Sequence, residues 1–307
     1  MTEHRLDPTP GAVTDVFDPS IPPVLTVDPG DTLVVHTLNA SGHLARKQSP
    51  DDDPERLIPN IRGHCLAGPI AVRGARPGMT LGVTLVALTP DEWGFTVAGS
   101  RDTPLNRRLG VAGGSPAWLL WDLDRDKLTG TNNLGFTVDL APFLGVIGLP
   151  PAEPGAHPTG PPRTVGGGNI DCRDLVAGST LYLPVTVPDA LLCVGDGHAA
   201  QGDGEVSGTA IECGMTTELR LDLTTDRPLD SVHAETPTSR ITFGFDQDLN
   251  EAMVAALDAM VDWMRSIFDL DKATALALAS TVVDLRVTQV ANGVWGVHAV
   301  LPNSAVR

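Results

Sequence analysis

The sequence predicts a mainly β protein with a smaller α+β part toward its C-terminal end. Three observations predict this fold class. Short runs in which apolar and polar residues alternate recur along most of the chain, which is the pattern of half-buried strands. The 32 glycines and 26 prolines are spread between these runs without a period, as turn residues of sandwiches and barrels are. A helical period appears only after residue 247.

The N-terminal part is expected to form strands separated by loops. Residues 13–38 are interpreted as short strands, with Pro29-Gly30 as the turn of a hairpin-like opening. Residues 39–60 lose the alternation and carry the acidic run Asp51–Asp53, which is typical of a solvated surface loop. The remaining expectations are strands at 69–73 and 80–88, a turn before Trp93-Gly94-Phe95, a connecting loop over 100–116, and strands at 117–124 and 134–139.

The second half of the chain begins with β patterns and ends with helices and strands. A strand and a Pro- and Gly-rich extended loop over 141–164 precede apolar runs at 179–187, 190–195 and 210–223 and a short strand within 224–247. Asp248 and Glu251 form a capping box before an amphipathic helix, and a second helix begins after Asp271. Two strands follow, turned at Ala291-Asn292-Gly293.

Three regions follow from this order of elements. They are an N-terminal β-rich region over residues 1–135, a central β-rich region over 136–230 and an α+β region over 231–307. We expect sandwich-like or barrel-like packing of strands in the first two regions. The third is expected to hold the helix pair and the terminal strands.

Charge and cysteine content narrow the classes of partner. The net charge is −17, so no basic surface is expected to neutralise the phosphates of a nucleic acid or an anionic membrane. Neither a signal-peptide pattern nor a run of about eighteen apolar residues occurs, which favours a soluble cytoplasmic protein. The four cysteines lack both CxxC spacing and the density of a disulfide scaffold, so free thiols are expected. A small neutral or cationic ligand suits this composition best.

Residues 166–214 concentrate glycines, acids and one histidine around two strand patterns. The polar residues of this stretch are, in order, Asn169, Asp171, Asp196, His198, Asp203, Glu205 and Glu212. The first six form three pairs in which the members are two residues apart. In an extended strand such residues point to the same side, so each pair can present two polar groups to one pocket.

These residue types suggest a metal site. A neutral imidazole with carboxylates is the usual ligand set for Zn²⁺ or a related divalent cation. His198 and Asp196 can lie side by side on one strand, whereas the fold would have to bring Asp171 and His64 to them. An EF-hand is excluded, because the acids lack the DxDxDG start and the glutamate at the twelfth position. The alternative is that Asp196 and Asp203 only form Asx-turns beside glycines and that His198 is a hydrogen-bonding loop residue.

A cysteine nucleophile stays open at this point. Cys193 lies five residues before His198, and Cys172 adjoins Asp171. Cys193 falls in an apolar strand, where a buried thiol is usually inert. Ser207 does not match the GxSxG elbow of α/β-hydrolases, and the glycines match neither the P-loop nor the GxGxxG pattern.

Six phrases of the chain are distinctive enough to compare with known families. They are IPPVLTVDPGDTL at 21–33, HCLAGPIAVRGARPGMTL at 64–81, APFLGVIGLPPAEPG at 141–155, GGNIDCRDLVAGSTLYLPV at 167–185, VGDGHAAQGDGEVSGTAIE at 194–212, and DLRVTQV at 284–290. Together they resemble the acetamidase/formamidase family of cytoplasmic amide hydrolases, in order along nearly the whole chain. The resemblance implies a β-rich fold with a small α+β portion, homo-oligomers such as a homodimer, release of ammonia from short amides, and a bound divalent metal.

The resemblance leads to the hypothesis that the protein hydrolyses a short aliphatic amide, such as formamide or acetamide, to its carboxylate and ammonia. The metal, zinc with calcium as the alternative, would be held by Asp171, Asp196 and His198. His64 would be a further ligand. A cation in this place would lower the pKa of a bound water and polarise the amide carbonyl.

The remaining candidates receive catalytic roles in this hypothesis. Glu205 would act as general base and later as acid to the leaving nitrogen, and Asp203 is grouped with it as a catalytic candidate. Asn169 and N–H groups of the glycine turns would stabilise the tetrahedral oxyanion. Two alternatives remain: a non-catalytic metal- or ligand-binding β protein with the same framework, and an amidase that uses Cys172 or Cys193.

Overall fold

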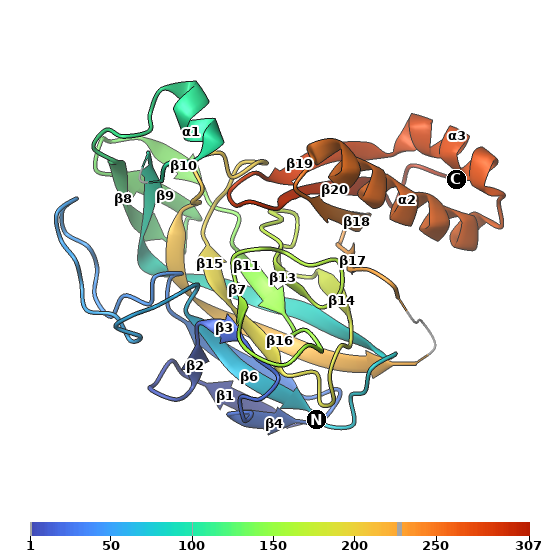
Figure 1. Cartoon of the computed structure of the whole chain (residues 1–307), viewed down its shortest axis with the longest axis horizontal. Helices are drawn as coiled ribbons and strands as arrows, with labels where there is room; N and C mark the ends of the chain where they lie inside the picture. The colour runs from blue at the N-terminus through green and yellow to red at the C-terminus, as the bar shows by residue number, and fades with distance from the viewer. Residues whose placement is uncertain (1, 100, 226–228) are drawn as a thin grey trace.

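The computed structural model describes residues 2–99, 101–225 and 229–307 (Figure 1). Its elements are β1 (Glu3–Leu6), β2 (Val13–Thr14), β3 (Val16–Phe17), β4 (Leu25–Val27), β5 (Thr32–Thr37), β6 (Leu66–Val72), β7 (Thr80–Ala98), α1 (Pro104–Leu109), β8 (Ala117–Asp124), β9 (Thr129–Asn132), β10 (Thr137–Asp139), β11 (Phe143–Gly148), β12 (His157–Pro158), β13 (Gly167–Asn169), β14 (Thr180–Pro184), β15 (Leu192–His198), β16 (Glu212–Thr224), β17 (His233–Glu235), β18 (Ser239–Asp246), α2 (Leu249–Phe268), α3 (Lys272–Val282), β19 (Asp284–Gln289) and β20 (Trp295–Pro302). The expected mainly β fold with a smaller α+β part is confirmed.

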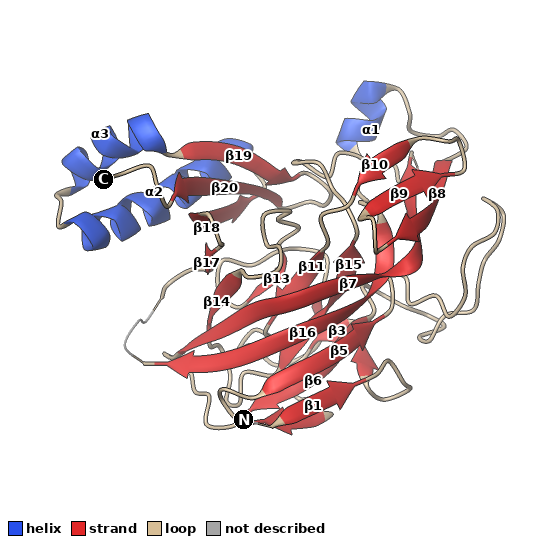
Figure 2. Cartoon of the chain, turned by 180° about the vertical axis from the view of Figure 1, so that it is seen from behind, coloured by secondary structure: helices blue, strands red, loops and turns tan. Residues whose placement is uncertain are grey.

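Two long strands, β7 and β16, hold the β-rich part together. They pair antiparallel from Phe95 opposite Glu212 to Thr80 opposite Thr224, and Figure 2 shows them crossing the molecule side by side. β16 also pairs with β5, and β7 also pairs with β14. Strands from residues 1–135 and from residues 136–230 are therefore hydrogen-bonded to one another.

The hairpin expected over residues 13–38 is wrong. A turn does form before β5, where the Asp31 N–H donates to the Asp28 carbonyl at 3.1 Å. The flanking strands then take different neighbours: β4 pairs in parallel with β6, whereas β5 pairs with β1 and β16. Alternation of apolar residues predicts a strand but not its partner, and here all three partner strands lie far away in sequence.

Two further expectations need correction. Trp93-Gly94-Phe95 does not follow a turn, because β7 continues through it, and the register shift beside Cys213 on β16 accommodates Pro90. The connecting loop over 100–116 contains the short helix α1. Thr103 caps this helix by accepting the Asn106 N–H at 3.1 Å, and Gly110 ends it.

The C-terminal part forms as its local signals predict. The Asn250 N–H donates to Asp248 at 2.8 Å at the start of α2, and the Ala273 N–H donates to Asp271 at 3.0 Å at the start of α3. Both helices lie together at one end of the molecule (Figure 1). They form a second hydrophobic core with β20, separate from the main core of the β-rich part. None of the helices in the described residues has the length and apolarity needed to cross a membrane.

Gly244 of β18 allows α2 to approach the sheet closely. A Cβ atom at this position would lie 2.6 Å from the Ala256 nitrogen and closer still to the Ala252 carbonyl oxygen. Because both atoms belong to the helix backbone, they cannot rotate away. We expect Gly244→Ala to lower the free energy of unfolding by about 3 kcal/mol or more, measured by urea denaturation with tryptophan fluorescence.

The matched control for this substitution is Gly293→Ala in the turn between β19 and β20. Nothing lies within 4 Å of a Cβ atom placed on Gly293. This variant should differ from the wild type by less than about 0.5 kcal/mol. Equal stability of the Gly244 variant and the control would show that α2 and β18 are not packed as closely as described.

Candidate active site

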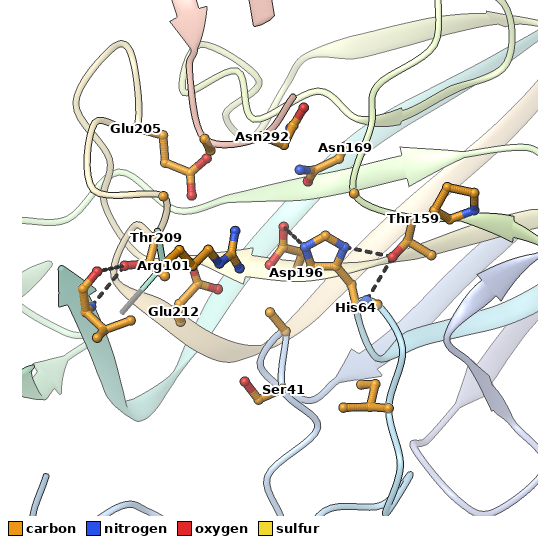
Figure 3. Close-up of a pocket in the computed structure, with 18 of the residues that line it drawn as sticks. Ser41, His64, Arg101, Thr159, Asn169, Asp196, Glu205, Thr209, Glu212 and Asn292 are labelled. Atoms are coloured by element: carbon orange, nitrogen blue, oxygen red, sulfur yellow. Dashed lines mark hydrogen bonds and ion pairs between the residues drawn. The ribbon is translucent and has the colours of Figure 1, made fainter. Parts of the chain in front are cut away.

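A cluster of buried polar side chains lies where β11, β13, β15 and β16 come together. Figure 3 labels those of its members that line the adjoining cavity. Its members are Asn169, Asp171, Asp196, His198, Glu205 and Glu212, each no more than 6% exposed. Four carboxyl groups and an imidazole have thus been removed from water. Such burial is costly unless the groups have partners or bind something.

β15 and β16 form the centre of the cluster. His198 is paired with Glu212 across these two antiparallel strands, and Asp196 lies two residues before His198 on β15. The His198 Nε2 atom is 3.4 Å from Asp196 Oδ1 and 3.4 Å from Glu212 Oε1. The imidazole therefore faces two carboxylates, one from its own strand and one from the neighbouring strand.

Gly145 of β11 leaves the space that these side chains occupy. A Cβ atom at this position would lie 2.6 Å from Asp171 Oδ1, 2.6 Å from Asp196 Oδ2 and 2.9 Å from His198 Cε1. The Gly145 carbonyl also accepts the Asp171 N–H at 3.2 Å, which holds Asp171, two residues after β13, against β11. The absence of a side chain at Gly145 lets carboxylates from two segments meet.

Gln201 determines which nitrogen of His198 carries a proton. The Gln201 Nε2 group donates to the Asp171 carbonyl at 2.7 Å, and because a carbonyl can only accept, the amide oxygen must face His198. That oxygen is 2.9 Å from His198 Nδ1, so Nδ1 is the donor. The lone pair of the neutral ring is then on Nε2, directed at the carboxylates, as in metal-binding histidines.

The backbone at three of the acids is left-handed. The φ angles are 53° at Asp171, 59° at Asp196 and 43° at Glu205. Residues other than glycine rarely adopt this conformation, which costs on the order of 1–3 kcal/mol each and is concentrated at functional sites. In this protein the unusual backbone accompanies three carboxylates of a single cluster.

Burial and mutual repulsion control the protonation of the cluster. Burial raises the pKa of Asp171 well above its ordinary value, and the charges of Glu205 and Asp196 raise it further. Burial also raises the pKa of Glu205 to about 8. Burial opposes the charged form of His198, but Glu212 and Asp196 outweigh it and raise the His198 pKa. The cluster therefore favours an added positive charge, whether a proton or a cation that competes with it.

The donor atoms fit a divalent cation. Asp171, Asp196 and His198 each offer a ligand atom within 4.8 Å of the others, and His198, Glu205 and Glu212 form a second such group. In the described part of the chain, hydrogen-bond partners are lacking for both Asp171 carboxylate oxygens, for His198 Nε2, and for one oxygen each of Glu205 and Glu212. Imidazole with carboxylates suits Zn²⁺, and a set this rich in oxygen also suits Ca²⁺.

His64, which lies just before β6, approaches the cluster from the N-terminal part of the chain. Its Nε2 atom is 3.9 Å from Asp196 Oδ2 (Figure 3). The Thr159 hydroxyl holds it in place, 2.8 Å from the His64 backbone nitrogen and 2.9 Å from Nδ1. The structure thus places His64 beside Asp196, one of the three residues that the sequence grouped with it.

The loop between β15 and β16 separates Glu205 from Asp203. The Gly204 N–H donates to the Thr288 carbonyl at 3.0 Å, and the Val290 N–H donates to the Gly204 carbonyl at 2.8 Å. These bonds attach the loop to the end of β19. Glu205 points into the buried cluster, whereas Asp203 is exposed and lines a different cavity. Asp203 therefore has no place in the arrangement described below.

A cavity of about 440 Å³ connects the cluster to the surface. The loops before β6, the segment around Thr159 and the turn between β19 and β20 contribute to its wall. The side chains of Asn169, Asp196, Glu205 and Glu212 face it (Figure 3). This volume is within the range of roughly 300–1,000 Å³ that is typical of small-molecule sites.

Sequence reasoning gave no role to three residues of this site. Glu212 ends the same glycine-rich stretch, but only the register of β15 and β16 shows that it faces His198. Gln201 lies three residues after His198, close enough in sequence to have been considered as its hydrogen-bond partner. Gly145 gives no signal, because a glycine inside the apolar run FLGVIG does not reveal what lies opposite.

The four cysteines are free and buried in the described structure, as expected. Burial raises the pKa of the Cys65 thiol to about 11 and that of the Cys193 thiol to about 12. The pKa values of Cys172 and Cys213 are raised even further by burial. A thiol with such a pKa is protonated at neutral pH and is a poor nucleophile.

Comparison with known proteins agrees with this architecture. Crystal structures of acetamidases from Bacillus halodurans and Yersinia enterocolitica superpose with TM-scores of 0.84 and 0.85. The Bacillus protein is 27% identical and the alignment covers 97% of each chain. The Yersinia protein is 26% identical, with 98% of this chain and 92% of that chain covered. The whole fold is therefore shared.

Sequence comparison gives the family. A formamidase of Methylophilus methylotrophus is 26% identical over 70% of this chain and 65% of its own, and an acetamidase of Mycolicibacterium smegmatis is 28% identical over 67% and 64%. The matches thus span somewhat less than two thirds of the length of these curated relatives. The model of the Acetamidase/Formamidase family matches residues 3–157 and 150–305. The chain therefore belongs to the acetamidase/formamidase family.

Proposed function

We propose that this protein hydrolyses the carboxamide of a primary amide to a carboxylate and ammonia. The observation that carries the proposal is the cluster of buried carboxylates and one imidazole whose unpartnered atoms converge beside a cavity of ligand size. Family membership and the similarity to acetamidases and a formamidase support amide cleavage as the reaction.

Asp171, Asp196 and His198 would hold a divalent cation. His64 and Glu212 would be its further candidate ligands. A cation there supplies Lewis acidity, which favours ionisation of a water molecule and polarises an amide carbonyl. We propose zinc, with calcium as the alternative. Gln201 supports this role by keeping the His198 Nε2 lone pair toward the carboxylates.

Glu205 is the proposed proton carrier. It borders the cavity, and its Oε2 atom has no hydrogen-bond partner among the described residues. The carboxylate accepts a proton from the attacking water as oxygen adds to the amide carbon. It then donates that proton to the amide nitrogen as the carbon–nitrogen bond breaks, so the nitrogen leaves as ammonia instead of an amide anion.

Asn169 is proposed to bind the carbonyl oxygen of the substrate. Its side chain lines the cavity next to Asp196 (Figure 3). The Nδ2–H group can donate to the oxygen as negative charge develops on it, and donors of this kind typically contribute a factor of about 10²–10³ in kcat.

The function is tested by metal analysis of the purified protein together with ammonia release from formamide and acetamide. We expect bound zinc or calcium and ammonia release that a chelator abolishes and the same metal restores. A metal-free protein with full amidase activity would contradict the metal mechanism. Metal binding with no turnover of any amide would instead favour the non-catalytic alternative.

Thiol modification separates the metal mechanism from the cysteine mechanism. Treatment of the native protein with N-ethylmaleimide should leave amide turnover unchanged, because all four thiols are buried and their pKa values are raised. The double variant Cys172→Ala, Cys193→Ala should also retain kcat. Inactivation by the reagent that substrate prevents would support a cysteine nucleophile.

A further inference from the structure

The cavity is larger and less polar than formamide or acetamide requires. Each of these amides has only a few heavy atoms, whereas the cavity measures about 440 Å³. Beyond the cluster its wall includes the apolar side chains of Ile61, Phe95, Val97 and Trp118. A ligand that contacted only the acids would leave this apolar surface in contact with water, which is unfavourable.

The apolar side of the cavity is preorganised. Val97 on β7 is paired directly with Trp118 on β8, so the strand register fixes both residues. The Phe95 ring is tilted against Trp118 with 5.7 Å between ring centroids, and the Lys47 ammonium lies 4.6 Å from the Trp118 ring. A rigid aromatic surface of this kind binds a flat apolar group without first having to become ordered.

Arg101, on the segment that follows β7, adds a positive charge to the same cavity (Figure 3). Its guanidinium has no ion pair or hydrogen bond with any described residue. By contrast, the Arg62 side chain in the same wall is neutralised by Asp15 at 2.6 Å. An arginine without a partner at the wall of a cavity suits an anionic ligand, although the chain as a whole carries a net charge of −17.

We propose that the preferred substrate is a primary amide whose acyl group contains an apolar body of about the size of a phenyl ring and ends in a carboxylate. The amide lies at the buried cluster, the ring contacts Phe95 and Trp118, and the carboxylate pairs with Arg101. This proposal rests on the proposed amide hydrolysis and assigns Arg101 as a specificity-determining residue. The net negative charge of the chain led us to expect a neutral or cationic ligand. The proposal differs from that expectation, because the charge of Arg101 at the cavity matters more for recognition than the net charge of the chain.

A panel of amides tests the substrate class. The probes are acetamide, phenylacetamide, succinamic acid, and the monoamide of para-phenylenediacetic acid. Because a buried ring adds contact area and the carboxylate adds a charge-assisted pair, we expect the last compound to have the highest kcat/KM, at least about thirtyfold above acetamide. A kcat/KM for acetamide equal to or above those of the other three would overturn the proposal.

Two arginine variants test the role of Arg101. Arg101→Gln should raise KM for the para-phenylenediacetic monoamide about tenfold while KM for acetamide and phenylacetamide and every kcat stay within about twofold. Arg108→Gln in α1 is the matched control, because it removes the same charge from an exposed side chain that does not line the cavity. Equal changes in both variants, or a parallel rise for the neutral amides, would contradict the assignment.

Calorimetric binding of para-phenylenediacetate separates this proposal from the proposed function. Suppose that the wild type binds this compound tightly, that Arg101→Gln weakens the binding, and that no amide is hydrolysed. The proposed ligand class would then be supported and the proposed hydrolysis refuted. Hydrolysis of acetamide without any advantage for the ring or the carboxylate would keep the hydrolysis and refute the ligand class.

Discussion

Gly145→Ala is expected to abolish both metal binding and amide hydrolysis. The added methyl group would occupy a point 2.6 Å from an oxygen of Asp171 and 2.6 Å from an oxygen of Asp196, so both carboxylates must move apart. A displacement of about 1 Å at a reacting centre commonly costs a factor of about 10² in rate, and here two proposed ligands are displaced together. We expect kcat/KM to fall at least about a hundredfold, with substoichiometric metal by elemental analysis.

The loss should come from the site and not from unfolding. Overpacking by one methyl group typically costs about 1–3 kcal/mol, which leaves most domains folded, and circular dichroism with urea denaturation checks this. Gly160→Ala is the matched control, because Gly160 lines the same cavity and a Cβ atom there has nothing within 4 Å. If the Gly145 variant kept full metal content and turnover, the converging carboxylates would not form the catalytic centre.

Glu205→Gln should reduce kcat strongly without removing the metal. The amide has nearly the same shape as the carboxylate but cannot take a proton from water and return it to nitrogen. Loss of a general base commonly costs a factor of about 10²–10⁴, so turnover of acetamide should fall by that amount while KM changes little. Steady-state kinetics and elemental analysis on the same preparation measure both quantities.

Asp203→Asn is the natural control for this variant. It lies two residues earlier in the same loop and changes the same charge, but its side chain is exposed outside the cluster. We expect near wild-type turnover. If the Glu205 variant lost metal along with activity, Glu205 would belong to the ligands, and if it kept full turnover, another group would carry the proton.

Features that depend on neighbouring residues could be predicted from the sequence. The helix after Asp248 and the helix after Asp271 each begin with a local cap, and the turn at Ala291-Asn292-Gly293 joins adjacent strands. The partners of β4 and β5 could not be predicted in this way. They lie on β6, β1 and β16, and an alternating pattern does not specify which distant strand completes a sheet.

In the candidate site too, sequence spacing predicts the position of some residues and not of others. Asp196 and His198 do meet as their spacing on β15 predicts, with 3.4 Å between His198 Nε2 and Asp196 Oδ1, although φ is 59° at Asp196. The same spacing does not bring Asp203 and Glu205 together, because both residues lie in the loop between β15 and β16, where the alternation of a strand does not apply.

The hydrogen bonds that join Gly204 to Thr288 and Val290 have a consequence for synthesis of the protein. The loop that carries Glu205 is held by residues that leave the ribosome more than eighty positions later, and Asn292 in the same late segment lines the cavity. Domains commonly fold as they emerge, but this pocket cannot be complete until β19 has emerged. A nascent or truncated chain that ends before β19 would therefore expose the acidic cluster without its closing wall.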